Sequence, residues 1–95
     1  MNKTWHLRIS GYVQGVGYRA ALHAAAQAGG INGWVRNCRD GTVEAVVQGD
    51  PRALENILAW AKRGPPLARV TDVSAQAAQG EFDRLYSGFD HLPTA

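Results

Sequence analysis

Residues 5–28 read WHLRISGYVQGVGYRAALHAAAQA and join an alternating segment, a glycine-rich loop and an alanine-rich segment. Apolar and polar residues alternate over residues 5–10, a period-two pattern that predicts a strand. Residues 19–28 are mostly alanine and other helix-forming residues, and Gly29 and Gly30 follow them, which predicts a helix that ends there. The chain is therefore expected to begin with a strand, a tight loop and a helix.

The loop between these two segments has the composition of an anion site. Glycines allow consecutive backbone N–H groups to turn inward toward one anion, and the N-terminus of the following helix adds partial positive charge. Gly15 and Gly17 stand here, and Arg19 follows with a permanent cation whose planar group can contact two phosphate oxygens at once. Residues 15–19 are therefore predicted to bind a phosphate group.

The same residues also match the dinucleotide pattern G-x-G-x-x-A, with Asp40 as a possible ribose ligand. This interpretation is rejected, because an Asp-Gly hairpin follows the helix directly and 95 residues are too few for the doubled parallel units of a dinucleotide fold. The G-x-x-x-x-G-K-S/T string of nucleotide P-loops does not occur in the chain.

Further along the chain, residues 31–39 and 42–48 flank Asp40 and Gly41, a pair that favours a tight hairpin. A longer loop that begins near Cys38 would change the pairing of the two strands, so their register stays open. Both interpretations place two antiparallel strands after the first helix.

The second half of the chain predicts a helix and one or two further strands. Asp50, followed by proline, is typical of a helix start, and Gly64 is typical of its end. Residues 67–77 then predict a strand. The final segment fits two interpretations. Helical spacing is shown by Phe82, Leu85, Tyr86 and Phe89, whereas residues 89–92 are typical of a short strand. We favour the strand.

The predicted order is strand, helix, strand, strand, helix, strand, which is the βαββαβ split βαβ plan of the ferredoxin-like α+β class. Its antiparallel sheet would carry both helices on one face, with a possible extra edge strand at the C-terminus. The buried stripe of the first helix would contain Tyr18, Leu22 and either Ala25 or Ala26. The core between sheet and helices would contain Leu7, Ile9, Leu22, Val43, Val47, Leu54, Ile57, Leu58, Val70 and Val73.

Length and composition point to one domain over residues 1–95 without a membrane segment. No apolar stretch approaches the roughly 20 residues of a membrane-spanning helix. The net charge of +2 comes from scattered basic residues and gives weak support for nucleic-acid binding. Cys38 is the single cysteine, so no intrachain disulfide can form and a cytoplasmic location is expected. His6, His23 and His91 lack metal-ligand spacing, so no metal site is predicted.

Two longer stretches contain the phosphate loop and the hairpin, namely residues 11–19, GYVQGVGYR, and residues 33–37, GWVRN. Both stretches closely resemble the two signatures of the acylphosphatase family, and the resemblance extends over most of the chain. The family spacing is also matched by Gly41, Val43 and Gly49.

This resemblance implies a metal-independent hydrolase without a cofactor that cleaves the carboxyl–phosphate bond of acyl phosphates on a ferredoxin-like fold. By position, Arg19 matches the family's phosphate-binding arginine and Asn37 its water-orienting asparagine. Its backbone anion cradle matches Gln14, Gly15, Val16, Gly17 and Tyr18. The residue types fit this chemistry. A carboxylate is a leaving group that needs no protonation, so the transition state mainly requires that the charge on the phosphoryl group is stabilised and that a water is placed in line with the breaking bond. The Tyr18 ring is interpreted as packing.

The sequence does not present an obvious general base for this reaction. Asp40 is explained by turn chemistry and Glu44 by an exposed strand face, so a phosphate oxygen of the substrate is the hypothetical acceptor of the water's proton. Arg36 and Arg39 are interpreted as a solvated hairpin face.

The expected partner is a small-molecule acyl phosphate, with inorganic phosphate as product, acted on by a monomer without a nucleic-acid or membrane partner. The alternative function is a non-catalytic anion- or RNA-binding ferredoxin-like module. It has little support, because the tryptophans lie in separate elements without the pattern of RNA-stacking strands. A regulatory domain of a larger enzyme is disfavoured because the chain ends after one domain.

Overall fold

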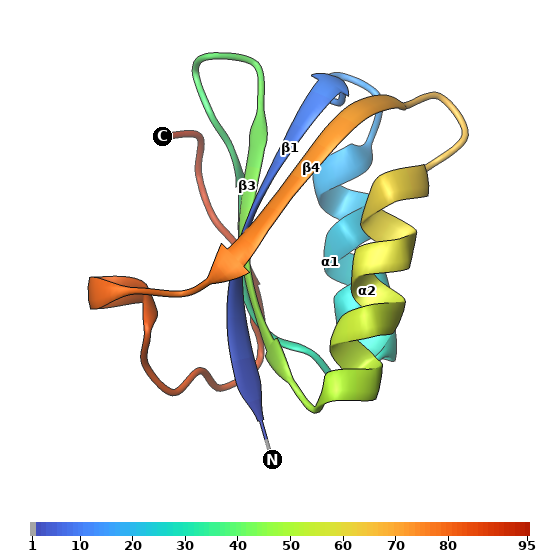
Figure 1. Ribbon diagram of the computed structural model, residues 1–95. Helices are drawn as coiled ribbons and strands as arrows, with labels where there is room; N and C mark the ends of the chain where they lie inside the picture. The colour runs from blue at the N-terminus through green and yellow to red at the C-terminus, as the bar shows by residue number, and fades with distance from the viewer. Residues whose placement is uncertain (1) are drawn as a thin grey trace.

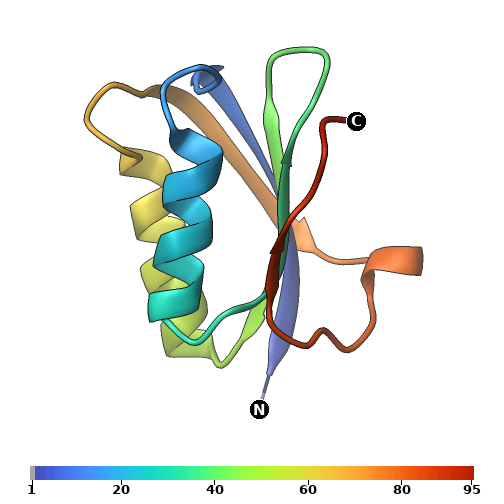
Figure 2. The ribbon, with the colours of Figure 1, turned by 180° about the vertical axis from the view of Figure 1, so that it is seen from behind.

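The computed structural model describes residues 2–95 and contains two helices packed on one face of a five-stranded sheet (Figures 1 and 2). In chain order the elements are β1 (Lys3–Tyr12), α1 (Tyr18–Ala28), β2 (Asn32–Asn37), β3 (Val43–Gly49), α2 (Pro51–Arg63), β4 (Arg69–Ala77), the 3-10 turn η1 (Gly80–Phe82) and β5 (Phe89–His91). The predicted ferredoxin-like α+β class is confirmed, and so is the short final strand. Within residues 2–95, no helix combines the length and apolar character needed to cross a membrane.

The strands are ordered β4-β1-β3-β2-β5, and β1, β2, β3 and β4 pair antiparallel as predicted. β5 is the expected extra edge strand and runs parallel to β2, with Val35 opposite His91. The sheet is therefore mixed. Residues 78–88 carry the chain from β4 at one edge of the sheet to β5 at the opposite edge. Both ribbon views show this segment on the side of the sheet away from the helices (Figures 1 and 2).

The β2–β3 hairpin is longer than a two-residue turn. Asn37 pairs with Val43, so residues 38–42 form the connection and the alternative of a loop that begins at Cys38 is confirmed. Asp40 stabilises this loop, because its Oδ1 accepts hydrogen bonds from the Thr42 backbone N–H at 2.9 Å and hydroxyl at 2.6 Å. The consequence for function is that Asn37 is the last residue of its strand.

Most of the predicted core is buried between the sheet and the helices. In α1 it is Ala26 that completes the buried stripe with Tyr18 and Leu22. The predicted core residues that are at most 4% exposed are Leu7, Ile9, Leu22, Val43, Val47, Leu54 and Ile57. Leu58 is only partly buried, and so are Val70 and Val73, which lie on the edge strand β4.

The face of the sheet away from the helices carries a second, smaller apolar cluster. Trp34 and Val46 pack there with Tyr86, and the Phe82 ring lies 5.6 Å from the Trp34 ring. Gln48 fixes the covering segment, since its side chain accepts a hydrogen bond from the Tyr86 N–H at 2.9 Å. The helical interpretation of residues 82–89 is wrong, because these contacts hold the segment in an irregular path after η1.

Glu44 lies on this same face and is 5% exposed, so the expectation of an exposed position is wrong. Its carboxylate lies 2.6 Å from His6 Nε2 and accepts a hydrogen bond from Arg36 Nε at 2.7 Å. Desolvation raises the pKa of Glu44, but the hydrogen bonds and charges of His6 and Arg36 outweigh it and hold the pKa below its ordinary value. The expectation of a solvated Arg36 is corrected as well, since this side chain is partly buried against Glu44.

The substitution Glu44→Gln is expected to lower the free energy of unfolding at pH 7 by about 2 kcal/mol, because Arg36 and His6 lose a charged acceptor in a buried setting. Since the folded pKa lies below the unfolded value of 4.5, this contribution is present above that pH and is lost as the pH falls through the folded pKa. Urea unfolding should therefore separate the variant from the parent more at pH 7 than at pH 3. Glu55→Gln, on the exposed face of α2, is the matched control. Equal stabilities at pH 7 would contradict the role of Glu44.

Candidate active site

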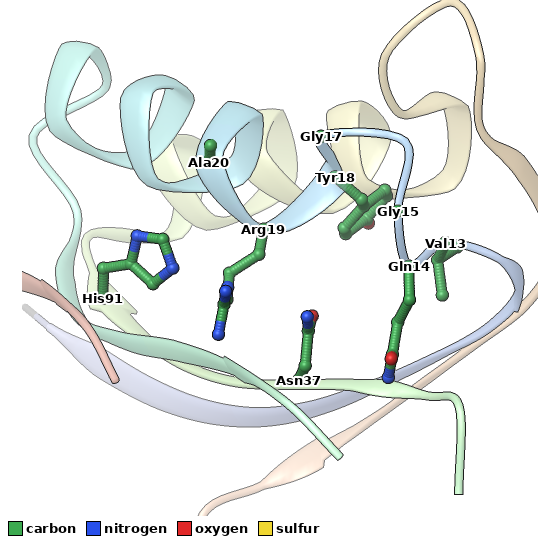
Figure 3. Close-up of a pocket in the computed structure, with 9 residues that line it drawn as sticks. All are labelled: Val13, Gln14, Gly15, Gly17, Tyr18, Arg19, Ala20, Asn37 and His91. Carbon is green, nitrogen blue, oxygen red and sulfur yellow. The ribbon is translucent and has the colours of Figure 1, made fainter. Parts of the chain in front are cut away.

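A pocket of about 220 Å³ opens where the N-terminus of α1 meets the C-terminal end of β2 (Figure 3). Its walls come from the β1–α1 loop, the first turn of α1, the last residue of β2 and the last residue of β5. The lining residues are Val13, Gln14, Gly15, Gly17, Tyr18, Arg19, Ala20, Asn37 and His91. The fold thus brings Arg19 and Asn37, which are 18 positions apart in the sequence, to one cavity.

The backbone of the β1–α1 loop requires its glycines. Gly15 and Gly17 have φ angles of 74° and 80°, in the left-handed region that other residues rarely adopt. Gly17 is also the N-cap of α1, where no side chain caps the free N–H groups and no acidic residue occupies the first turn. The partial positive charge of the helix N-terminus therefore borders the pocket without an internal anion to compensate it.

Gln14 ties this loop to the β2–β3 hairpin. Its Nε2 donates hydrogen bonds to the backbone carbonyls of Cys38 at 2.7 Å and Thr42 at 2.8 Å. Since these carbonyls lie in the connection that follows Asn37, the amide of Gln14 fixes the loop relative to Asn37. The side-chain amide of Gln14 thus donates to the hairpin, so an anion in the pocket would contact the backbone of Gln14.

Tyr18 ties the loop to α2. The side chain is buried, its hydroxyl donates a hydrogen bond to the Ala61 carbonyl at 2.7 Å, and its ring lies 5.5 Å from the Trp60 ring. Burial raises the pKa of Tyr18, so the phenol stays neutral. These contacts agree with a packing role for the ring. Val16 does not line the pocket, and its side chain packs partly buried against the core.

Arg19 projects its guanidinium from α1 into the pocket (Figure 3). Nη1 donates a hydrogen bond to the Leu92 carbonyl at 3.2 Å, which holds the side chain beside the segment after β5. The ion pairs found among residues 2–95 join His6, Arg8 and Arg36 to Asp40 and Glu44 and do not include Arg19. A guanidinium has five N–H donors, so most of its donors remain for an anion.

Asn37 projects from the end of β2 into the same pocket, and Figure 3 shows its carboxamide between Arg19 and Gln14. Its Oδ1 is buried and accepts no hydrogen bond from the described part of the chain. Leaving a buried polar atom unsatisfied costs about 1–3 kcal/mol. An acceptor kept in this state at the wall of a pocket is therefore suited to a ligand or a reacting water.

His91 lines the pocket but was not predicted as a site residue. Local sequence offers little signal for it, because its place depends on the pairing of β5 with β2. The nearby His23 is a satisfied histidine, with Nε2 3.0 Å from the Phe89 carbonyl. Among the described residues, no group of three or more His, Cys, Asp or Glu side chains is placed to hold a metal ion.

The two carboxylates near Asn37 in the sequence do not line the pocket. Asp40 is exposed in the hairpin loop, where the hydrogen bonds from Thr42 hold its pKa below the ordinary value. Glu44 lies on the opposite face of the sheet with His6 and Arg36. Neither carboxylate is placed to take a proton from a water beside Asn37.

The fold and the pocket together define an α+β domain with a polar pocket at a helix N-terminus. The acylphosphatase family model matches residues 5–90. An acylphosphatase of Thiobacillus denitrificans is 51% identical over 88 residues, which cover 93% of this chain and 94% of that protein. An acylphosphatase of Thermococcus kodakarensis is 54% identical over 76 residues, which cover 80% of this chain and 84% of that protein.

Among solved structures, an acylphosphatase from Coxiella burnetii matches with a TM-score of 0.87 at 32% sequence identity, covering 96% of this chain and 93% of that one. The chain belongs to the acylphosphatase family. The predicted enzyme class is thereby confirmed.

The substitution Gln14→Met is expected to weaken the binding of inorganic phosphate about tenfold and to lower the free energy of unfolding by about 1–2 kcal/mol. Methionine has a similar length but cannot donate to the Cys38 and Thr42 carbonyls, so the loop loses its tie to the hairpin. Isothermal titration with phosphate and urea unfolding measure the two effects. Gln27→Met, at an exposed position of α1, is the control. Unchanged phosphate affinity would show that the tie does not position the loop.

Proposed function

We propose that the pocket hydrolyses the carboxyl–phosphate bond of acyl phosphates, with the phosphoryl group held by the loop amides and Arg19 and the attacking water oriented by Asn37. The observation that carries this proposal is that Asn37, whose buried Oδ1 has no hydrogen-bond partner in the described chain, lines the same cavity as an arginine without a carboxylate partner there. Neither group is explained by packing alone.

The phosphoryl group would bind between the loop and the Arg19 guanidinium. The positive φ angles of Gly15 and Gly17 and the uncapped N-terminus of α1 supply backbone donors and partial positive charge. These groups are fixed before the substrate arrives, so little reorganisation is needed as charge spreads over the phosphoryl oxygens in the transition state. The bond from Arg19 to the Leu92 carbonyl contributes to this preorganisation.

The water would donate a hydrogen bond to Asn37 Oδ1 and present its lone pair to phosphorus. The new bond forms between water oxygen and phosphorus, while the bond between phosphorus and the acyl oxygen breaks and its electron pair leaves with the carboxylate. Asp40 and Glu44 are held elsewhere, which supports transfer of the water's proton to a phosphoryl oxygen. The products are a carboxylate and inorganic phosphate.

This chemistry assigns the necessary charge stabilisation to protein groups, so we propose that the reaction proceeds without a metal ion or cofactor. We also propose that residues 1–95 act as one domain and as a cytoplasmic monomer on small molecules.

The alternative function of RNA binding is not favoured by the sheet, because Trp34 and Tyr86 on the face away from the helices are only 6% and 8% exposed. Base stacking on a sheet requires accessible rings.

The substitution Arg19→Gln is expected to lower kcat/KM for benzoyl phosphate at least about 1,000-fold and to abolish measurable phosphate binding, because the pocket loses its permanent cation. Phosphate release in the presence of a chelator and isothermal titration measure the two quantities. Arg52→Gln, at an exposed position of α2, should match the parent. Strong phosphate binding by the Arg19 variant would contradict the assignment of Arg19 to the phosphate site.

The substitution Asn37→Ala is expected to lower kcat for benzoyl phosphate about 100- to 1,000-fold. Phosphate affinity should stay within about threefold of the parent, because Asn37 is assigned to the water and not to the phosphate. The free energy of unfolding should change by less than about 1 kcal/mol, since a buried acceptor without a protein partner is removed.

Asn32→Ala, at the other end of β2, is the control for Asn37→Ala. Turnover by Asn37→Ala at the parental rate would refute the role in positioning water. A parallel loss of phosphate binding would assign Asn37 to the phosphate instead.

A further inference from the structure

His91 occupies the wall of the pocket on the side of Arg19 away from the glycine loop (Figure 3). It lies opposite Val35 in the parallel pairing of β5 with β2, so both side chains point to the same face of the sheet. Val35 is fully buried in the core under the helices, and Asn37 follows it on that face after one intervening residue. His91 and Asn37 therefore both project toward α1.

The charged neighbours of His91 are cations. From α1, Arg19 approaches it in the pocket, and the His23 ring lies 5.9 Å away between ring centroids. From β2, the groups on this face are Val35 and Asn37, which carry no charge. The ion pairs of residues 2–95 do not include His91, so the structure offers it no carboxylate.

This environment disfavours the protonated form of the exposed His91 imidazole. Desolvation and then the positive charges of Arg19 and His23 lower the pKa of His91. A negative group bound next to the ring would act in the opposite direction and favour the protonated form. Binding of such a group would therefore be linked to uptake of a proton.

The pocket also has room beyond the phosphoryl group. Its volume of about 220 Å³ corresponds to roughly seven water-sized volumes of about 30 Å³ each, whereas a phosphate has five heavy atoms. In an in-line displacement the leaving group lies opposite the attacking water. The acyl group therefore leaves the phosphoryl group on the side away from the water at Asn37, and His91 is the lining residue on the side of Arg19 away from the glycine loop in Figure 3.

We propose that His91 determines specificity for the acyl group: its protonated imidazole binds an anionic substituent on the acyl part of the substrate, and the enzyme favours acyl phosphates that carry a second negative charge. This inference rests on the proposed function, since it assumes that the phosphoryl group lies between the loop and Arg19. His91 is not required for the bond-breaking step itself.

The test compares two substrates that differ in one charge, 4-carboxybenzoyl phosphate and 4-carbamoylbenzoyl phosphate, which have the same shape. The measured quantity is the ratio of their kcat/KM values at pH 5.5 and pH 8. In the parent, this ratio should be roughly three- to tenfold higher at pH 5.5, because the lower pH increases the protonated fraction of His91. His91→Gln should abolish the pH dependence, and His91→Arg should give a high ratio at both pH values.

The matched control is Asp90→Asn, which precedes His91 on β5 and is exposed. It should keep the parental ratio at both pH values. A pH-independent ratio in the parent would overturn the role of His91 even if a variant failed to fold. Equal losses for both substrates in His91→Gln would overturn it as well, because the residue would then act on the phosphoryl group. Failure of the parent to hydrolyse either substrate would refute the proposed function together with this inference.

Discussion

The two hydrogen bonds from the Gln14 carboxamide to the hairpin carbonyls hold the active site together. The loop amides belong to the connection between β1 and α1 and Arg19 to the first turn of α1, whereas Asn37 belongs to the end of β2. Sheet register brings these segments near each other, but the loop itself is not part of the sheet. A displacement of about 1 Å between a bound group and its attacker can cost 100-fold in rate. The side-chain amide of Gln14 connects the loop to the hairpin and so restricts movement of the loop relative to Asn37.

The sequence was sufficient for those parts of the site whose geometry is local. Gly15, Gly17 and Arg19 form a strand-to-helix loop whose conformation follows from the residue types, and the order of strands and helices follows from periodicity. The position of Asn37 at a strand end required the hairpin register, which depends on Asp40 and Thr42 and not on the Asp-Gly pair alone.

The rest required contacts between distant segments. His91 reaches the pocket because residues 78–88 cross the sheet and place β5 beside β2, and a three-residue strand carries no local signal for that path. The prediction that Glu44 is exposed was wrong. The alternation of residues along a strand shows which side chains lie on the face away from the core, but it does not show whether another segment covers that face. Burial of that face comes from the residues around Phe82 and Tyr86.

The sheet separates the chemistry of the protein from part of its stabilising network. The pocket lies on the helix side, whereas the contacts of Glu44 with His6 and Arg36 lie on the other. Substitutions in the two layers share few contacts, so their effects on the free energy of unfolding should be nearly additive. The C-terminal segment belongs to both layers, since Leu92 packs against the second cluster with its side chain and accepts from Arg19 with its carbonyl.

The N-terminus of α1 has no capping side chain, and an anion bound there would stabilise the fold. A helix that begins at Gly17 without a capping side chain is less stable than it could be, and a bound anion would supply the missing acceptor. Ligands that bind only the native state raise its stability with the logarithm of their concentration. If the product phosphate serves as this acceptor, the free energy of unfolding rises as the product accumulates, so the reaction would stabilise its own catalyst.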